Sequence, residues 1–376
     1  MRYYIIAGEA SGDLHASNLT KELFSIDPQA EIRGWGGDLM ATQGAKIVKH
    51  FKDLAFMGFV EVLMNIRTVI RNLNFCKQDI LNFKPDALIL VDYPGFNLRI
   101  AKWAKQNNLK VFYYISPSVW AWKENRVENI RNDTDKLFTI LPFEKAFYAK
   151  HNIEVEYEGH PLLDAFENNQ GSYGSKETFL KENELDNREI IAVLPGSRKS
   201  EINHMLPEFL KTAQRFPQYQ FVIAGAPSLD RQVFEKHMRG IKLKILFGKT
   251  YQLLHFSRAG IITSGTATLE TALFNVPQVV CYKGNSISFA IIKKLVMKNL
   301  KYISLVNLIL DKPILKELIQ ENMTAEKIAI ELKPLLEESK EREAMMEGYR
   351  SIKKILGGGG ASERIAKKIF HLLKKG

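Results

Sequence analysis

The sequence predicts an α/β protein with two doubly wound, parallel-sheet domains facing each other across a cleft. Short apolar runs alternate with helical patterns through both halves of the chain, as is typical of parallel sheets covered by helices. The length of 376 residues accommodates two domains of roughly 100–200 residues each. A segment rich in Asn, Gln, Gly and Ser, residues 167–175, predicts the linker between them.

The strand-like runs divide into two sets. The first half contains 3–7, 31–34, 87–91, 110–115, 137–140 and 155–157, and the second contains 190–194, 220–224, 244–246, 260–263 and 278–281. We therefore predict an N-terminal domain over residues 1–165 and a C-terminal domain over residues 166–349. Glycines at 357–360 precede a basic amphipathic helix. This last segment, about 350–376, either packs back on the first domain or frays at the chain end.

The composition is that of a soluble globular protein, with 45% hydrophobic and 25% charged residues. No apolar run reaches the length of about 20 residues that spans a bilayer. The first apolar run is too short for a signal peptide and is followed at once by Glu9, which favours a first strand. Cys76 and Cys281 form no motif, so we expect a reduced, cytoplasmic compartment.

The charge balance predicts an anionic partner. The formal net charge is +11, which fits nucleic acid, an anionic membrane surface or phosphorylated substrates. A basic patch interleaved with aromatic residues, as in RNA-binding proteins, is not found in the sequence. The histidines show no metal-ligand spacing, and Asp133-Thr134-Asp135 lies beside basic residues in a polar connection. We therefore expect no metal and no cofactor.

The first strand ends in a turn that could hold a sugar. Gly8, Glu9, Ser11 and Gly12 follow the run 3–7 and open a helix. Glycines permit a tight turn and close approach of a ligand, and the Glu9 carboxylate suits sugar hydroxyls. The motif is not the dinucleotide fingerprint G-x-G-x-x-G, so a binding turn and a plain turn are both open.

Residues 51–75 combine apolar and basic side chains at close spacing. Such a segment rests in a membrane interface, lines an acyl-chain groove, or forms an ordinary core helix. The candidate contacts are Phe56, Met57, Phe59, Val60, Leu63, Arg67 and Arg71. Residues 287–301 repeat the apolar-plus-basic pattern, which favours a lipid-facing role for both segments.

Asp92 is the candidate general base. It follows the apolar run 87–91, and open parallel sheets bind ligands at the carboxyl ends of their strands. A partly desolvated carboxylate there would have a raised pKa suited to proton abstraction. The alternative is an Asx turn beside Pro94-Gly95.

Two loops of the second half predict a nucleotide site. Gly196, Ser197 and Arg198 follow the run 190–194, and a guanidinium there can grip a diphosphate and offset leaving-group charge. The alternative is a surface arginine.

The second loop, Ser264-Gly265-Thr266, starts a helix after the run 260–263. Free N–H groups at that start suit a phosphate, and Glu270, one turn on, can reach a ribose hydroxyl. The alternative is an ordinary helix N-cap.

Ordered blocks along the chain resemble the lipid-A-disaccharide synthase family. They are AGEASGD (7–13), MGFVEVL (57–63), SPSVWAW (116–122), LPFEKAFY (141–148), GH (159–160), LPGSR (194–198), SGTATLE (264–270) and YISLVN (302–307). The resemblance implies a bacterial glycosyltransferase of GT-B type with two Rossmann-like domains. It places the family's critical aspartate at Asp92, its second-domain arginine at Arg198, and nucleotide contacts at 264–270 and Asn307. Val306 departs from the proline that is common in the family before the asparagine, and residues 34–37 also differ locally from some members.

The resemblance also implies the reaction. Such enzymes join UDP-2,3-diacylglucosamine to 2,3-diacylglucosamine 1-phosphate, without metal, at the inner membrane surface, and release UDP. We expect Asp92 to take the proton of the acceptor 6-hydroxyl in a single inverting displacement. The alternatives are another GT-B enzyme of UDP-N-acetylglucosamine (the muropeptide glucosaminyltransferase or a UDP-sugar 2-epimerase) and a non-catalytic membrane- or nucleic-acid-binding protein.

Overall fold

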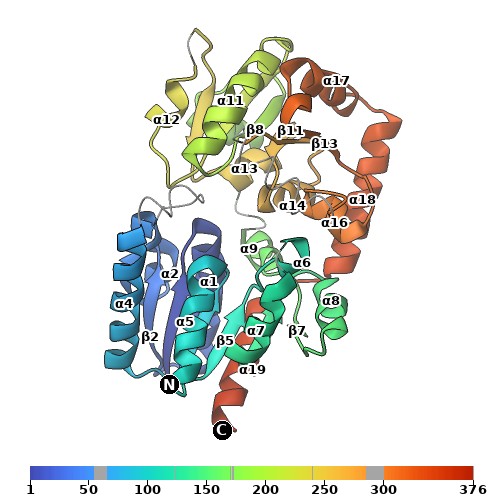
Figure 1. The fold of residues 1–376 in the computed structure, drawn as a ribbon. Coiled ribbons are helices and arrows are strands. Elements are labelled where there is room, and N and C mark those ends of the chain that lie inside the picture. Colours follow the sequence, from blue (N-terminus) through green and yellow to red (C-terminus); the bar gives the residue numbers. More distant parts are fainter. Residues whose placement is uncertain are drawn as a thin grey trace. The chain divides into compact units, whose positions relative to one another are not determined.

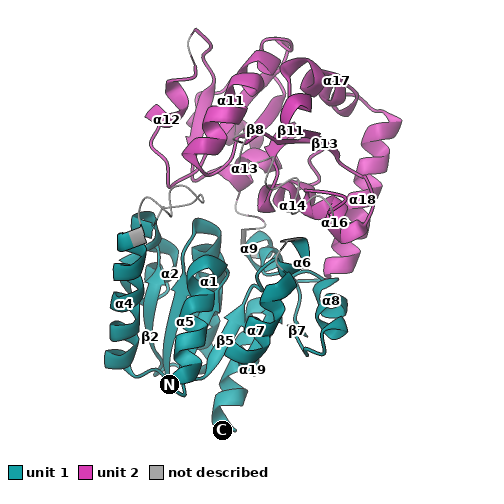
Figure 2. Ribbon diagram, viewed as in Figure 1, with its two compact units in different colours: residues 1–167, 358–376 teal, residues 168–357 magenta. Residues whose placement is uncertain are grey.

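The computed structural model describes residues 1–54, 66–122, 124–169, 171, 173–238, 240–284 and 300–375. They divide into two units, each with its own sheet (Figure 2). Unit 1 contains Met1–Glu167 and Gly358–Gly376, and unit 2 contains Asn168–Gly357. The chain therefore enters unit 2 once and returns to unit 1 for its last helix.

Unit 1 is built on a seven-stranded parallel sheet in the order β3-β2-β1-β4-β5-β6-β7. The strands are β1 Arg2–Ala7, β2 Glu31–Gly36, β3 Lys46–His50, β4 Ala87–Val91, β5 Val111–Tyr114, β6 Lys136–Thr139 and β7 Glu156–Tyr157. The strand order reverses between β1 and β4, the switch point where such sheets bind ligands. Ala7 pairs with Val91, so Gly8 and Asp92 leave the sheet side by side.

Helices cover both faces of this sheet (Figure 1). They are α1 Ala10–Ile26, α2 Asp38–Thr42, η1 Phe51–Leu54, α4 Ile66–Phe83, α5 Pro94–Gln106, α6 Val119–Trp122, η2 Glu124–Arg126, α7 Val127–Asp133, α8 Glu144–Lys150, α9 Leu162–Asn169 and α19 Ala361–Lys374. Successive strand residues point to opposite faces. Tyr4 and Ile6 accordingly belong to one apolar layer, and Tyr3 and Ile5 belong to the other.

The C-terminal helix α19 packs on α1 in unit 1. Ile365 and Ile369 are fully buried in the apolar layer that contains Leu19. The Asp164 carboxylate of α9 accepts hydrogen bonds from the first N–H groups of this helix, those of Gly360 (2.7 Å), Ala361 (3.1 Å) and Ser362 (2.8 Å). A residue nearly two hundred positions earlier in the chain thus caps the last helix.

Unit 2 is built on a six-stranded parallel sheet in the order β10-β9-β8-β11-β12-β13. Its strands are β8 Ile190–Leu194, β9 Gln220–Gly225, β10 Lys244–Phe247, β11 Ser257–Thr263, β12 Gln278–Tyr282 and β13 Lys316–Ile319. Its helices are α10 Lys176–Glu182, α11 Lys199–Ala213, α12 Gln232–Glu235, α13 Thr250–His255, α14 Thr266–Leu273, α16 Leu305–Leu310, η3 Gln320–Asn322, α17 Ala325–Leu336 and α18 Lys340–Leu356. The predicted fold class, two doubly wound parallel-sheet α/β domains, is confirmed.

No helix in the described part of the chain combines the length and apolarity needed to cross a membrane.

The Asp164 cap predicts a measurable loss of stability. Asp164→Ala leaves three N–H groups of α19 without their acceptor, so we expect the free energy of unfolding to fall by about 1–3 kcal/mol. Urea unfolding followed by circular dichroism measures the change. Glu363→Ala, at an exposed position in the same helix turn, is the control, and equal losses in the two variants would contradict the capping role.

Candidate active site

The turn after β4 fixes the backbone of Asp92. Asp92 and Tyr93 are both in the left-handed region, with φ of 45° and 50°, a conformation that costs non-glycine residues free energy. The Asp92 carbonyl oxygen accepts hydrogen bonds from the Asn97 side-chain amide (2.8 Å) and the Tyr113 hydroxyl (2.7 Å). Asn97 and Tyr113 are fully buried, so the interior of unit 1 holds this turn in place.

The turn after β1 packs directly on the turn after β4. A Cβ on Gly8 would overlap the Tyr93 ring, so this approach requires glycine. Burial raises the pKa of Tyr93, and the negative charge of Glu9 adds to the shift. The structure thus brings together Gly8, Glu9 and Asp92, while Ser11, the second residue of α1, is partly exposed and Gly12 is buried.

Asp13, in the same motif, has a structural role that the sequence did not indicate. Its buried carboxylate accepts N–H hydrogen bonds from Gly37 (2.7 Å), Leu39 (3.1 Å) and Met40 (3.3 Å). Burial raises the pKa of Asp13, and these three N–H groups oppose the shift. The carboxylate therefore fastens the start of α2 beside the glycine turn rather than facing a ligand.

Glu144 is a buried acid at the same edge of the sheet. Its carboxylate accepts hydrogen bonds from the Leu141 N–H (2.9 Å), the Ile140 N–H (3.1 Å) and the Trp120 indole (3.2 Å). Burial raises the pKa of Glu144 to about 7, although the three hydrogen bonds lower it, and the negative charge of Asp92 adds to the rise. Glu144 lies in the LPFEKAFY block close to Ile140 and Leu141, but its burial and its contact with the distant Trp120 could not be predicted from the sequence.

The loop after β8 is closed by Glu201, three residues beyond Arg198. Gly196 has a φ of 105°, and a Cβ there would overlap the Glu201 carboxylate. That carboxylate accepts the N–H groups of Ser197 (2.9 Å) and Arg198 (3.3 Å) and pairs with the Arg198 guanidinium at 3.2 Å. The N–H groups and the guanidinium predicted to bind a diphosphate therefore lie together, and all of them contact the Glu201 carboxylate.

The turn after β11 presents the start of α14. Ser264 donates its hydroxyl to the Ile303 carbonyl (2.8 Å), and Gly265 and Thr266 are exposed. No side chain caps the helix start. Glu270 accepts a hydrogen bond from the Tyr251 hydroxyl (3.1 Å), and burial raises the Glu270 pKa. The structure thus leaves the phosphate-type turn open while Tyr251 orients the carboxylate predicted to bind ribose.

Asn307 belongs to a buried network centred on Glu317. Its side chain donates to the Leu315 carbonyl (2.9 Å) and to Glu317 (2.9 Å) and accepts the Leu315 N–H (2.8 Å). Glu317 also accepts the N–H groups of Ile303 (3.0 Å) and Ser304 (2.9 Å). Since the Ile303 carbonyl accepts the Ser264 hydroxyl, Glu317 supports the turn before α14, a role that the sequence did not indicate.

The lipid-contact candidates are only partly described. Phe56, Met57, Phe59, Val60 and Leu63 lie outside the described residues, as does most of 287–301.

Arg67 and Arg71 are exposed on α4. Ile70 and Phe75, at helical spacing from them, are 51% and 47% exposed. This face of α4 is both apolar and basic.

The two aspartates of the D-x-D motif point to different partners. Asp135 pairs with Lys105 (2.8 Å) and accepts the Val111 N–H (2.8 Å), whereas Asp133 lines a pocket with Arg126. The part of the chain that the structure describes contains no group of three or more His, Cys, Asp or Glu side chains arranged for a metal ion.

Comparison with known proteins decides the family. The model of the lipid-A-disaccharide synthetase family matches residues 3–369. The chain belongs to the lipid-A-disaccharide synthase family. The lipid-A-disaccharide synthase of Geobacter metallireducens is 36% identical over 381 residues, covering 100% of this chain and 98% of that protein. The Syntrophus aciditrophicus synthase is 36% identical over 380 residues, covering 99% and 97%.

Solved structures agree on the fold of this synthase family member. A UDP-GlcNAc 2-epimerase from Neisseria meningitidis, solved with UDP-GlcNAc bound, has a TM-score of 0.67 at 15% identity and covers 99% of this chain and 100% of its own. The glycotransferase of kitacinnamycin has a TM-score of 0.63 at 11% identity, covering 99% of each chain. These structures confirm the predicted fold, and the family match and the relatives confirm the glycosyltransferase class and the resemblance to lipid-A-disaccharide synthases.

The raised pKa of Glu144 predicts a pH-dependent stability. The pKa of Glu144 is about 7 in the folded protein, against an ordinary value of 4.5. Its contribution to the free energy of unfolding is therefore fully present below pH 4.5, and it is lost as the pH rises to 7 because only the unfolded chain ionises in this range. The loss amounts to about 3 kcal/mol. The Glu144→Gln side chain does not titrate, so the unfolding free energy of the wild type minus that of the variant should fall across this window.

Urea titrations at pH 5 and pH 7.5 measure that difference. The subtraction is needed because the buried His15 and His160 have lowered pKa values and contribute the opposite slope. A difference that does not change with pH would show that Glu144 is ionised throughout.

Proposed function

We propose that the protein joins UDP-2,3-diacylglucosamine to 2,3-diacylglucosamine 1-phosphate. The product is the β-1,6-linked lipid A disaccharide 1-phosphate, and UDP leaves. The observation that carries the proposal is the family match over residues 3–369. It is supported by three strand-end turns of the kind this chemistry needs, one with Asp92 in unit 1 and two in unit 2.

Asp92 acts as the general base in this proposal. It removes the proton of the acceptor 6-hydroxyl as that oxygen attacks the anomeric carbon from the face opposite UDP, so the configuration inverts. The rigid turn supports this role, because a base must be held in hydrogen-bonding reach of the proton. Glu9, beside it, binds acceptor hydroxyls together with the turn of Gly8, Ser11 and Gly12.

Unit 2 stabilises the departing UDP. Arg198, with the Gly196-Ser197 backbone, and the open start of α14 at Ser264, Gly265 and Thr266 provide positive charge and N–H donors for the diphosphate. Arg198 exchanges its Glu201 partner for phosphate when the donor binds. Glu270 holds the ribose, and Asn307 acts through the segment that carries the Ile303 carbonyl.

The apolar and basic face of α4 supports binding to an anionic inner-membrane surface. Arg67 and Arg71 would meet lipid phosphates while Ile70 enters the interface. Phe56, Met57, Phe59, Val60 and Leu63 remain candidate acyl contacts. Both substrates carry acyl chains, so a synthase resting on the membrane meets them where they reside.

UDP-N-acetylglucosamine 2-epimerase activity is the second candidate, since several solved structures named as such epimerases share the fold. Identity of 15% or less with them, against 36% with the synthases, favours disaccharide formation. Incubating the purified protein with the two acylated sugars distinguishes the candidates, because only the synthase yields a disaccharide phosphate.

Asp92→Asn tests the base. We expect turnover to fall by about 10²–10⁴-fold, with unchanged UDP affinity and melting temperature, in a mass-spectrometric assay of the disaccharide phosphate. The control is Glu154→Gln, which changes an exposed acid of the same unit. Near-normal turnover of a folded Asp92→Asn enzyme would refute the assignment.

The double variant Arg67→Gln/Ile70→Asn tests the membrane face. We expect it to bind vesicles containing phosphatidylglycerol about tenfold more weakly, because both charge attraction and apolar burial are reduced. Vesicle co-flotation measures the affinity. Ile330→Asn, at a 62% exposed position in unit 2, is the matched control. Unchanged flotation of the α4 variant would remove α4 from the membrane-binding surface.

A further inference from the structure

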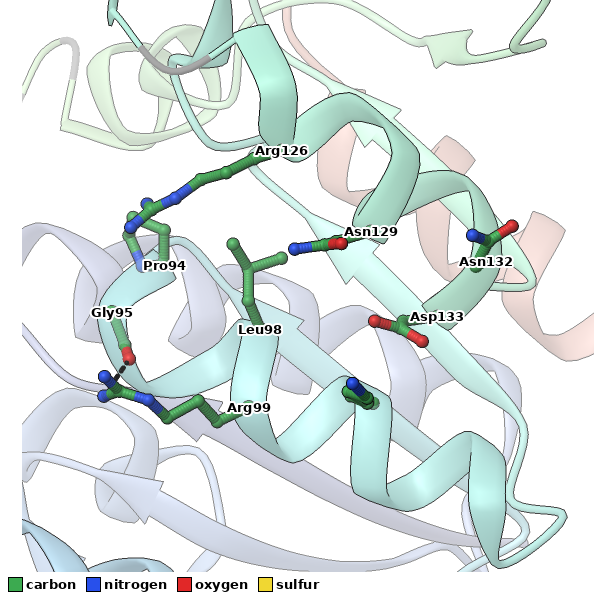
Figure 3. A pocket seen from close by; sticks show the side chains of 9 residues that line it. Pro94, Gly95, Leu98, Arg99, Arg126, Asn129, Asn132 and Asp133 are labelled. Atoms are coloured by element: carbon green, nitrogen blue, oxygen red, sulfur yellow. Dashed lines mark hydrogen bonds between the residues drawn. The ribbon is translucent and has the colours of Figure 1, made fainter.

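A basic pocket lies between α5 and the η2–α7 segment of unit 1 (Figure 3). Its volume is about 350 Å³, enough for a small ionic group with its water. The lining includes Gly95, Arg99, Lys102, Arg126 and Asp133. Nothing in the proposed catalytic steps uses this pocket.

We propose that this pocket binds the phosphate monoester of the acceptor sugar, between the Arg99 and Arg126 guanidinium groups. The inference rests on the proposed function, since it names the site for one part of the proposed acceptor.

The charge of the pocket fits a phosphate monoester. Arg99, Lys102 and Arg126 supply three positive charges against the single carboxylate of Asp133, leaving an excess of two. A phosphate monoester carries about −1.5 to −2 at neutral pH. Such a group would neutralise the excess, and guanidinium forks match its oxygens bidentately. The side-chain amide of Asn129, also in the lining, adds an uncharged donor.

The two arginines are held in a mutually repulsive arrangement. Burial lowers the pKa of Arg126, and the positive charge of Arg99 lowers it further. Arg99 is anchored by a hydrogen bond from its guanidinium to the Gly95 carbonyl (2.8 Å). Figure 3 shows the Arg126 guanidinium beside Pro94 and that of Arg99 beside Gly95, at one end of the pocket. An anion placed there would convert this repulsion into attraction to both groups.

The pocket adjoins the turn that carries the proposed base. Pro94 and Gly95, which line it, begin α5 immediately after Asp92 and Tyr93. On its other side, Arg126 interacts electrostatically with Tyr113, whose hydroxyl binds the Asp92 carbonyl. The 6-hydroxyl and 1-phosphate of the acceptor belong to one sugar ring, so a phosphate held here keeps that ring beside Asp92.

The test compares acceptors with and without the 1-phosphate. In Arg99→Gln/Arg126→Gln, we expect KM for the phosphorylated acceptor to rise about 10-fold to 100-fold. KM for UDP-2,3-diacylglucosamine and for the dephosphorylated acceptor should not change. Arg131→Gln, an exposed α7 residue outside the pocket lining, is the matched control. A rise in KM that is equal for both acceptors would overturn the proposal.

Binding measurements separate this site from lipid headgroups and from failure of the proposed function. Glucosamine 1-phosphate, titrated by 31P NMR, should bind the wild type and not the double variant, even if no disaccharide is formed. Flotation with phosphatidylglycerol vesicles should be the same for both proteins. Loss of vesicle binding with unchanged glucosamine 1-phosphate binding would assign the arginines to the membrane and refute the phosphate pocket.

Discussion

The candidate site of unit 1 depends on the two hydrogen bonds to the Asp92 carbonyl oxygen. Two consecutive non-glycine residues in the left-handed region do not persist without support, and Asn97 and Tyr113 supply it from the core. With the turn fixed, Tyr93 packs on Gly8 and the Pro94 turn starts α5. The candidate base, the glycine turn after β1 and the edge of the basic pocket are therefore all positioned by these two hydrogen bonds.

Carboxylates fasten loops and helix starts throughout the described structure. Asp13, Glu144, Asp164, Glu201 and Glu317 each accept two or more hydrogen bonds from backbone N–H groups. Backbone N–H groups in these segments have no acceptor in a sheet or helix, so a carboxylate that accepts several of them supplies the missing hydrogen bonds. Asp13 and Asp164 hold the starts of helices, whereas Glu201 accepts the N–H groups that we propose for the diphosphate.

The sequence predicted the buried parallel strands and missed others for a physical reason. β8 is a continuous apolar run and is buried throughout, which is the pattern of a central parallel strand. The edge strands β7 and β10 were predicted, whereas β3 and β13 were missed because charged residues such as Lys46 and Glu317, which point to solvent or to loops, leave them no continuous apolar run. The turns bearing Asp92 and Ser264 could be predicted, since strand ends define them. Their supports, Tyr113 and Glu317, could not, because their partners are distant along the chain.

The hydrogen bonds of Asn307 hold its position although Val306 precedes it in place of the proline that is common in the family. Val306 replaces a proline that is common in the family, yet it is the second residue of α16, within the first helical turn, where proline and other residues are both tolerated. Ser304 caps the helix by accepting the Asn307 N–H (3.4 Å), and Leu315 and Glu317 fix the side chain. The geometry of Asn307 is therefore set by its hydrogen bonds and not by the residue before it. Through Glu317, which also accepts the Ile303 N–H, Asn307 is joined to the segment whose Ile303 carbonyl accepts the Ser264 hydroxyl.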